Sequence, residues 1–67
     1  MKSVTGAEFC RALARNGWLL ARIRGSHHTW TKKDQGTVTV PVHAGRDLGR
    51  GLLARLLKQS GLTEDDV

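Results

Sequence analysis

The feature that most restricts the fold is a run of alternating valines, Val38, Val40 and Val42, interleaved with polar residues and Pro41. Alternate residues of a strand point to opposite faces, so residues 37–43 predict a strand with one apolar and one open face. Pro41 cannot donate a ladder hydrogen bond and indicates a sheet edge or the end of regular pairing. The apolar face requires a covering layer.

Two stretches with helical spacing of apolar residues predict that layer. Thr5 and Glu8 have the spacing of a capping box, and Asn16-Gly17 is a typical helix stop. The second helix is predicted to end near Ser60-Gly61, after a leucine stripe and after a glycine-containing loop over residues 44–51. The stripe consists of Leu52, Leu53, Leu56 and Leu57.

Two further strands are predicted over residues 18–24 and 27–33, joined to the valine strand by a hairpin loop at residues 34–36. Gly25-Ser26 indicates a break or bulge. Strict alternation in residues 18–24 places Leu19, Ala21 and Ile23 on one face and Leu20, Arg22 and Arg24 on the other. The sequence therefore predicts an α+β fold of helix, three antiparallel strands and helix, with both helices on the valine face.

Length and composition limit the class of protein. Sixty-seven residues predict one domain, residues 1–67, and a single cysteine excludes an internal disulfide and favours a reducing, cytoplasmic compartment. The apolar runs are too short to cross a membrane. The formal charge of +5 favours a nucleic-acid partner, although charge alone is also consistent with solubility.

Two adjacent histidines are the candidate catalytic groups. On a strand, His27 and His28 point to opposite faces. His28 shares a face with Trp30, whereas His27 alternates with threonines, so His27 is predicted to lie on the open face and His28 to be at least half-buried.

An exposed imidazole beside cations fits RNA cleavage, because a histidine with an ordinary pKa of about 6.5 exchanges protons near neutrality. Arg22 and Arg24 are predicted to bind the phosphate, and Ser26 either shapes the turn or binds phosphate. A lone strand histidine is, however, more often an ordinary polar residue.

Other sites are less well supported. A zinc site from Cys10 and the three histidines lacks paired ligand spacing, and Cys10 as a nucleophile is disfavoured because free cysteines are usually buried. Trp18 and Trp30 are expected in the core rather than stacked on bases. The loop Gly45–Gly51 has no P-loop signature, so a flexible connection is favoured over a phosphate cradle.

The chain resembles the HicA toxins, also described as YcfA-like mRNA interferases. The resemblance covers nearly the whole chain and is most specific where Gly-Ser-His is followed by Val-Pro-x-His. The matching segments are Thr5-Gly6-Ala7-Glu8, Asn16-Gly17-Trp18, Arg24-Gly25-Ser26-His27-His28, Val38-Thr39-Val40-Pro41-Val42-His43 and Leu57-Lys58-Gln59-Ser60-Gly61-Leu62.

The resemblance implies a fold like the double-stranded RNA-binding domain and metal-independent cleavage of mRNA that arrests growth. The family's catalytic histidine follows Gly-Ser, which is His27 here, and a HicB-type antitoxin would cover that site. Two alternatives remain: a non-catalytic RNA-binding module using the same basic face, and a protein-interaction domain for which RNA binding is incidental.

Overall fold

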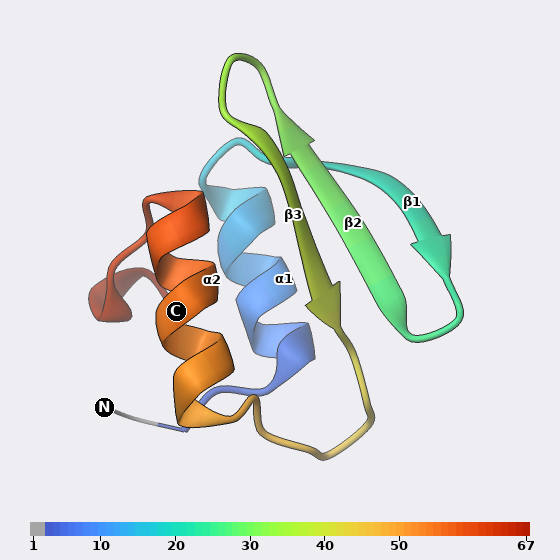
Figure 1. Cartoon of the computed structure of the whole chain (residues 1–67), viewed down its shortest axis with the longest axis vertical. Helices are drawn as coiled ribbons and strands as arrows, with labels where there is room; N and C mark the ends of the chain where they lie inside the picture. The colour runs from blue at the N-terminus through green and yellow to red at the C-terminus, as the bar shows by residue number, and fades with distance from the viewer. Residues whose placement is uncertain (1–2) are drawn as a thin grey trace.

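A computed structural model describes residues 3–67 of the chain and has the predicted order of helix, three strands and helix (Figure 1). The fold is α+β and like the double-stranded RNA-binding domain, as predicted. The elements are α1 (Gly6–Arg15), β1 (Leu19–Arg24), β2 (His27–Lys32), β3 (Gly36–Pro41), α2 (Arg50–Ser60) and a short 3-10 helix, η1 (Glu64–Asp66).

Both ends of α1 are fixed by side chains that complete backbone hydrogen bonding. The Glu8 amide donates to Thr5 Oγ1 at 3.1 Å and the Thr5 amide donates to Glu8 Oε1 at 2.8 Å, so the predicted capping box is present. At the other end, Asn16 Nδ2 donates to the Ala12 carbonyl and Lys32 Nζ donates to the Asn16 carbonyl, each at 2.8 Å. The lysine comes from β2, so it ties the end of the helix to the sheet.

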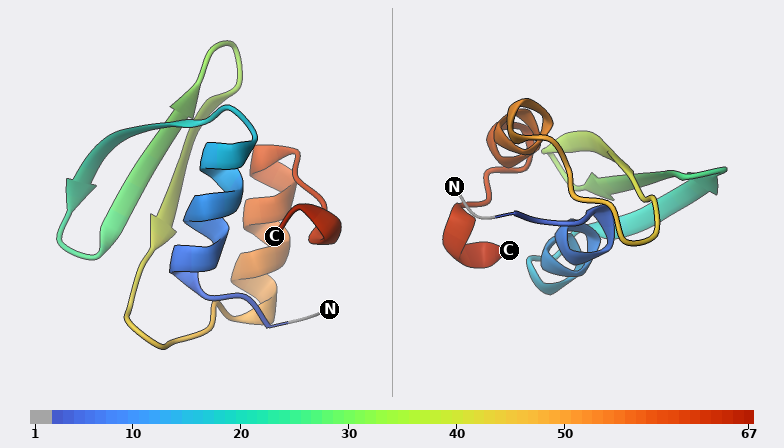
Figure 2. Two further views of the ribbon diagram at one scale, coloured as in Figure 1. Left: turned by 180° about the vertical axis from the view of Figure 1, so that it is seen from behind. Right: turned by 90° about the horizontal axis from the view of Figure 1, so that it is seen from below.

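The three strands form one antiparallel sheet in the order β1-β2-β3. Helices α1 and α2 run side by side in the same direction, and both contact β3 (Figures 1 and 2). Val38 and Val40 are buried and Val42 packs against the core, so the valine face is the covered one. The core thus lies between the helices and the β3 side of the sheet.

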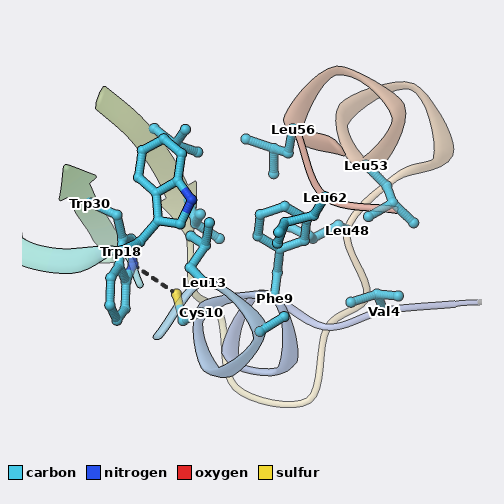
Figure 3. Packing of buried hydrophobic residues seen from close by; sticks show 13 residues of the cluster. Val4, Phe9, Cys10, Leu13, Trp18, Trp30, Leu48, Leu53, Leu56 and Leu62 are labelled. Carbon is cyan, nitrogen blue, oxygen red and sulfur yellow. Dashed lines mark hydrogen bonds between the residues drawn. The ribbon is translucent and has the colours of Figure 1, made fainter. Parts of the chain in front are cut away.

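Two tryptophan side chains form part of the core next to the sheet. Trp18 and Trp30 are buried, as predicted, and Trp30 Nε1 donates a hydrogen bond to Cys10 Sγ at 3.3 Å (Figure 3). The rest of the core comes from both helices, β3 and the connecting segments. It includes Val4, Phe9, Ala12, Leu13, Leu48, Leu53, Leu56 and Leu62.

Strand β1 differs from the prediction. Leu20 pairs with Trp30 and Arg22 with Thr29, so a bulge at Ala21 shifts the register by one residue. Residues paired directly across a ladder share a face, so Leu20 lies with Ile23 on the Trp30 face. The prediction that placed Leu20 with the arginines and Leu19 with Ile23 was wrong, because strict alternation fails at a bulge. Leu19 pairs with Thr31 and therefore lies on the open face.

Several turns and element boundaries also differ from the prediction. Gly25-Ser26 is neither a break nor a bulge but a two-residue hairpin turn, with Gly25 at a φ of +59°. Strand β3 ends at Pro41 rather than His43, as expected for a residue that cannot extend the ladder. Helix α2 begins at Arg50, so Gly51 lies inside the helix rather than in the preceding loop.

Candidate nucleic-acid interface

The candidate site is the face of the sheet opposite the helices. The register aligns Arg24 with His27 and Pro41 across the three strands, and aligns Arg22 with Thr29 and Thr39 one step along. Cross-strand partners lie with Cβ atoms about 5 Å apart and diagonal neighbours about 7–8 Å apart. His27 therefore has Arg24 beside it and Arg22 on the diagonal, as the sequence predicted.

The tight turn between β1 and β2 produces this arrangement. Only Gly25 of the two turn residues has a positive φ, which is the pattern of a type II′ turn with glycine in first position. Such a turn matches the twist of the flanking strands, so Arg24 and His27 are held as the first cross-strand pair. His27 is exposed at this end of the sheet.

His28 points to the other face and is half-buried, as predicted. Its cross-strand partners are Ile23 and the fully buried Val40. The two histidines are therefore in different environments, and His27 is the one of the pair that a large substrate on the open face reaches.

Ser26 connects this turn to the segment after β3. Its carbonyl accepts a hydrogen bond from the Val42 amide at 2.7 Å, and the residue is half-buried. The backbone of Ser26 thus connects the turn to the residues that follow β3. His43 lies two residues beyond the end of β3 and is exposed.

Threonines form the middle of the open face. Thr29 and Thr39 are cross-strand partners, and their hydroxyl oxygens are 3.2 Å apart, a hydrogen-bond distance. Thr31 Oγ1 donates to the Gly36 carbonyl at 3.3 Å. Thr29 was not singled out as a candidate by sequence reasoning, although the same alternation that selected His27 places it on this face.

The charge on this face is positive. Arg22 and Arg24 are both exposed, and none of the three strands contains an aspartate or glutamate. No pocket is found in residues 3–67, so a ligand would lie across an open surface rather than in a cavity. Such a surface suits an extended polyanion better than a small molecule.

Two other candidates from the sequence were a metal site and a nucleophilic Cys10. Within residues 3–67, no group of three or more histidine, cysteine, aspartate and glutamate side chains is placed to hold a metal ion. Burial raises the pKa of the Cys10 thiol, although the hydrogen bond from Trp30 and the charge of Arg11 act in the opposite direction. A buried thiol with a raised pKa is a poor nucleophile.

The glycine-containing loop before α2 is tied to the N-terminal segment. Leu48 is buried, its amide donates to the Val4 carbonyl at 2.7 Å, and Asp47 forms an isolated bridge with Thr5. Arg46 and Arg50 are exposed on either side. Sequence reasoning missed the anchoring role of Leu48, for which the only signal was a single leucine among polar residues and glycines.

The fold and its basic open face define a small α+β protein of the double-stranded RNA-binding-domain type. The family model for the HicA toxin of bacterial toxin-antitoxin systems matches residues 6–62, so the chain belongs to the HicA toxin family. A comparison with curated proteins gives no significant match. The family assigns the chain a toxin role and an antitoxin as its partner. None of the helices in residues 3–67 is long and apolar enough to span a membrane.

Proposed function

We propose that this toxin is a metal-independent endoribonuclease that cuts mRNA with His27 and is inhibited by a HicB-type antitoxin. The observation that carries the proposal is the pairing of exposed His27 with exposed Arg24 on an open face that has no acidic strand residue. This arrangement supplies a proton acceptor and a phosphate-binding cation side by side.

The chemistry needs no group beyond the RNA and these side chains. His27 removes the proton from a ribose 2′-hydroxyl, the 2′-oxygen attacks phosphorus, and the bond from phosphorus to the 5′-oxygen breaks. The imidazolium then returns its proton to the 5′-oxygen. The products are a 2′,3′-cyclic phosphate and a 5′-hydroxyl end.

Arg24, with Arg22 on the diagonal, would bind the scissile phosphate. Guanidinium groups make two parallel hydrogen bonds to phosphate oxygens and stabilise the charge that develops there. Ser26 would contribute through the turn that holds Arg24 and His27 together, or through its hydroxyl. A single general acid–base group contributes about 10²–10⁴-fold, so positioning and charge must supply the remaining acceleration.

The function is tested by producing the parent protein and two histidine variants in bacteria. Growth and the integrity of total mRNA are followed after induction. The parent and the control variant His43→Ala are expected to arrest growth and degrade mRNA, whereas His27→Ala is expected to do neither. Arrest by His27→Ala with the same mRNA loss would overturn the assignment.

The mechanism is tested separately with an RNA that carries deoxyribose at the cut position. Because the attacking 2′-oxygen is missing, that bond should resist cleavage while neighbouring bonds are still cut. Efficient cleavage at the deoxyribose would exclude 2′-hydroxyl attack. A non-catalytic RNA-binding module is the alternative, and it predicts binding without any new RNA ends.

A further inference from the structure

Strand β1 is exposed along its whole length although it carries three large apolar side chains. Leu19, Leu20 and Ile23 are 69%, 44% and 55% exposed. The helices pack toward the β3 side of the sheet, so β1 extends beyond them (Figure 1). In so small a protein this is a notable apolar surface to leave in water.

The backbone of β1 is also unpaired along one edge. β1 pairs with β2 on one side, and no strand of residues 3–67 lies on the other. In an antiparallel ladder, bonded and non-bonded pairs alternate, so about half of the β1 amide and carbonyl groups point outward. An unpaired edge of this kind is a template for a further strand.

The side chains of this edge specify what such a strand must carry. Arg22 and Arg24 lie on the open face with His27, and Leu19 lies on this face at the start of the strand. Leu20 and Ile23 lie on the opposite face with Trp30 and His28. A strand added beside β1 would place its own alternate residues next to these two rows. The complementary strand is acidic on one face and apolar on the other.

We propose that the antitoxin inhibits this protein by adding such a strand to the outer edge of β1. The inference rests on the proposed function for the role of His27 and the arginines. A second copy of the chain is a poorer occupant, because antiparallel pairing of two β1 strands brings arginines against arginines and joins two chains of charge +5. RNA does not explain the exposed leucine and isoleucine side chains.

The added strand would regulate the site directly. Neighbouring strands are about 4.8 Å apart, so acidic side chains on the added strand would reach the row of Arg22 and Arg24. His27 lies one strand further in, about 10 Å away, within the footprint of even a small partner domain. Acidic groups would occupy the cations that otherwise bind phosphate, so antitoxin and RNA would compete.

Hydrogen exchange tests the placement of the strand. The full-length toxin, alone and in complex with its full-length antitoxin, is compared residue by residue by NMR. Amides in residues 19–24 that exchange rapidly in the free toxin are expected to slow by tenfold or more in the complex. Equal exchange of these amides in both samples would overturn the proposal.

Matched variants test the side-chain pattern. The double variant Leu20→Thr, Ile23→Thr carries two β-branched polar side chains, and Leu20→Val, Ile23→Val, which has apolar side chains of the same shape, serves as its control. The threonine variant is expected to bind the antitoxin at least tenfold more weakly than the valine variant, at a temperature at which circular dichroism shows both variants to be folded. Equal affinities would contradict the proposed contact.

Two further readouts separate this inference from the proposed function. RNA cleavage by the free threonine variant is expected to equal that of the parent, because neither substituted residue lies on the open face. If the parent does not cleave RNA but the β1 amides are still protected in the complex, the nuclease function is wrong and the proposed antitoxin contact with β1 is retained. A concentration-dependent dimer of toxin alone with protected β1 amides would assign the edge to a second copy and overturn the proposal.

Discussion

The substitution Gly6→Ala tests how α1 packs on the end of β3. Gly6 is buried in the first turn of α1, and a Cβ there would overlap the Pro41 carbonyl oxygen and lie 3.0 Å from Val42 Cα. Both atoms belong to the backbone, so a side-chain rotation cannot relieve the contact. The chain must instead move the helix or the strand end.

The expected cost follows from this geometry. Overpacking of a well-packed site typically costs 1–3 kcal/mol, and a clash with backbone places Gly6→Ala near the upper end, at about 3 kcal/mol. For a chain of 67 residues the total stability is roughly 3–10 kcal/mol, so this is a large fraction of it. The melting temperature should fall by about 12–24 °C.

The chain offers a control of opposite sign. Gly51 lies in the first turn of α2, where a Cβ would meet no other group within 4 Å, and alanine there gains at most about 0.8–1 kcal/mol of helix propensity. Thermal unfolding followed by circular dichroism should show Gly51→Ala melting above the parent and Gly6→Ala well below it. A Gly6→Ala melting temperature within 2 °C of the parent would refute the close contact between α1 and the end of β3.

Three further predictions concern single side chains. Thr5→Ala removes the acceptor for the Glu8 amide and should cost about 1 kcal/mol, measured by urea unfolding; an unchanged midpoint would contradict the capping box. Cys10 is buried and has a raised pKa, which lowers its thiolate fraction at pH 8, so a thiol reagent should label it far more slowly in the native protein than in denaturant; equal rates would show that the site is open. Arg24→Ala should lower kcat/KM for RNA by about 10–100-fold through loss of a charge-assisted hydrogen bond, whereas Arg55→Ala on the exposed side of α2 should not; equal effects would mean that only net charge matters.

Much of the fold could be predicted because local signals agreed with the tertiary structure. The capping box of Thr5 and Glu8, the alternation of Val38 and Val40 and the glycine at position 61 each act within a few residues. Gly61 adopts a φ of +73° at the end of α2, as its position after a leucine stripe predicts. Such signals depend little on what the rest of the chain does.

The features that could not be predicted depend on contacts between distant segments. The bulge at Ala21 becomes visible only when β1 is aligned with β2, because the sequence of β1 is compatible with strict alternation. Leu48 likewise is buried in contact with a distant segment, since its amide donates to the carbonyl of Val4, 44 residues earlier. Of the candidate site, the face of His27 was predictable from alternation with its neighbours, and its chemical role is the proposal that remains to be tested.

The most direct test of the account is cleavage of a 5′-labelled single-stranded RNA by purified protein in excess chelator. The parent, His27→Ala and the control His43→Ala are compared at equal concentration on a denaturing gel. The account predicts cleavage by the parent and by His43→Ala, with ends carrying a 2′,3′-cyclic phosphate, and a rate at least about 10²-fold lower for His27→Ala. Equal cleavage by the parent and His27→Ala, or intact RNA with the parent, would contradict it.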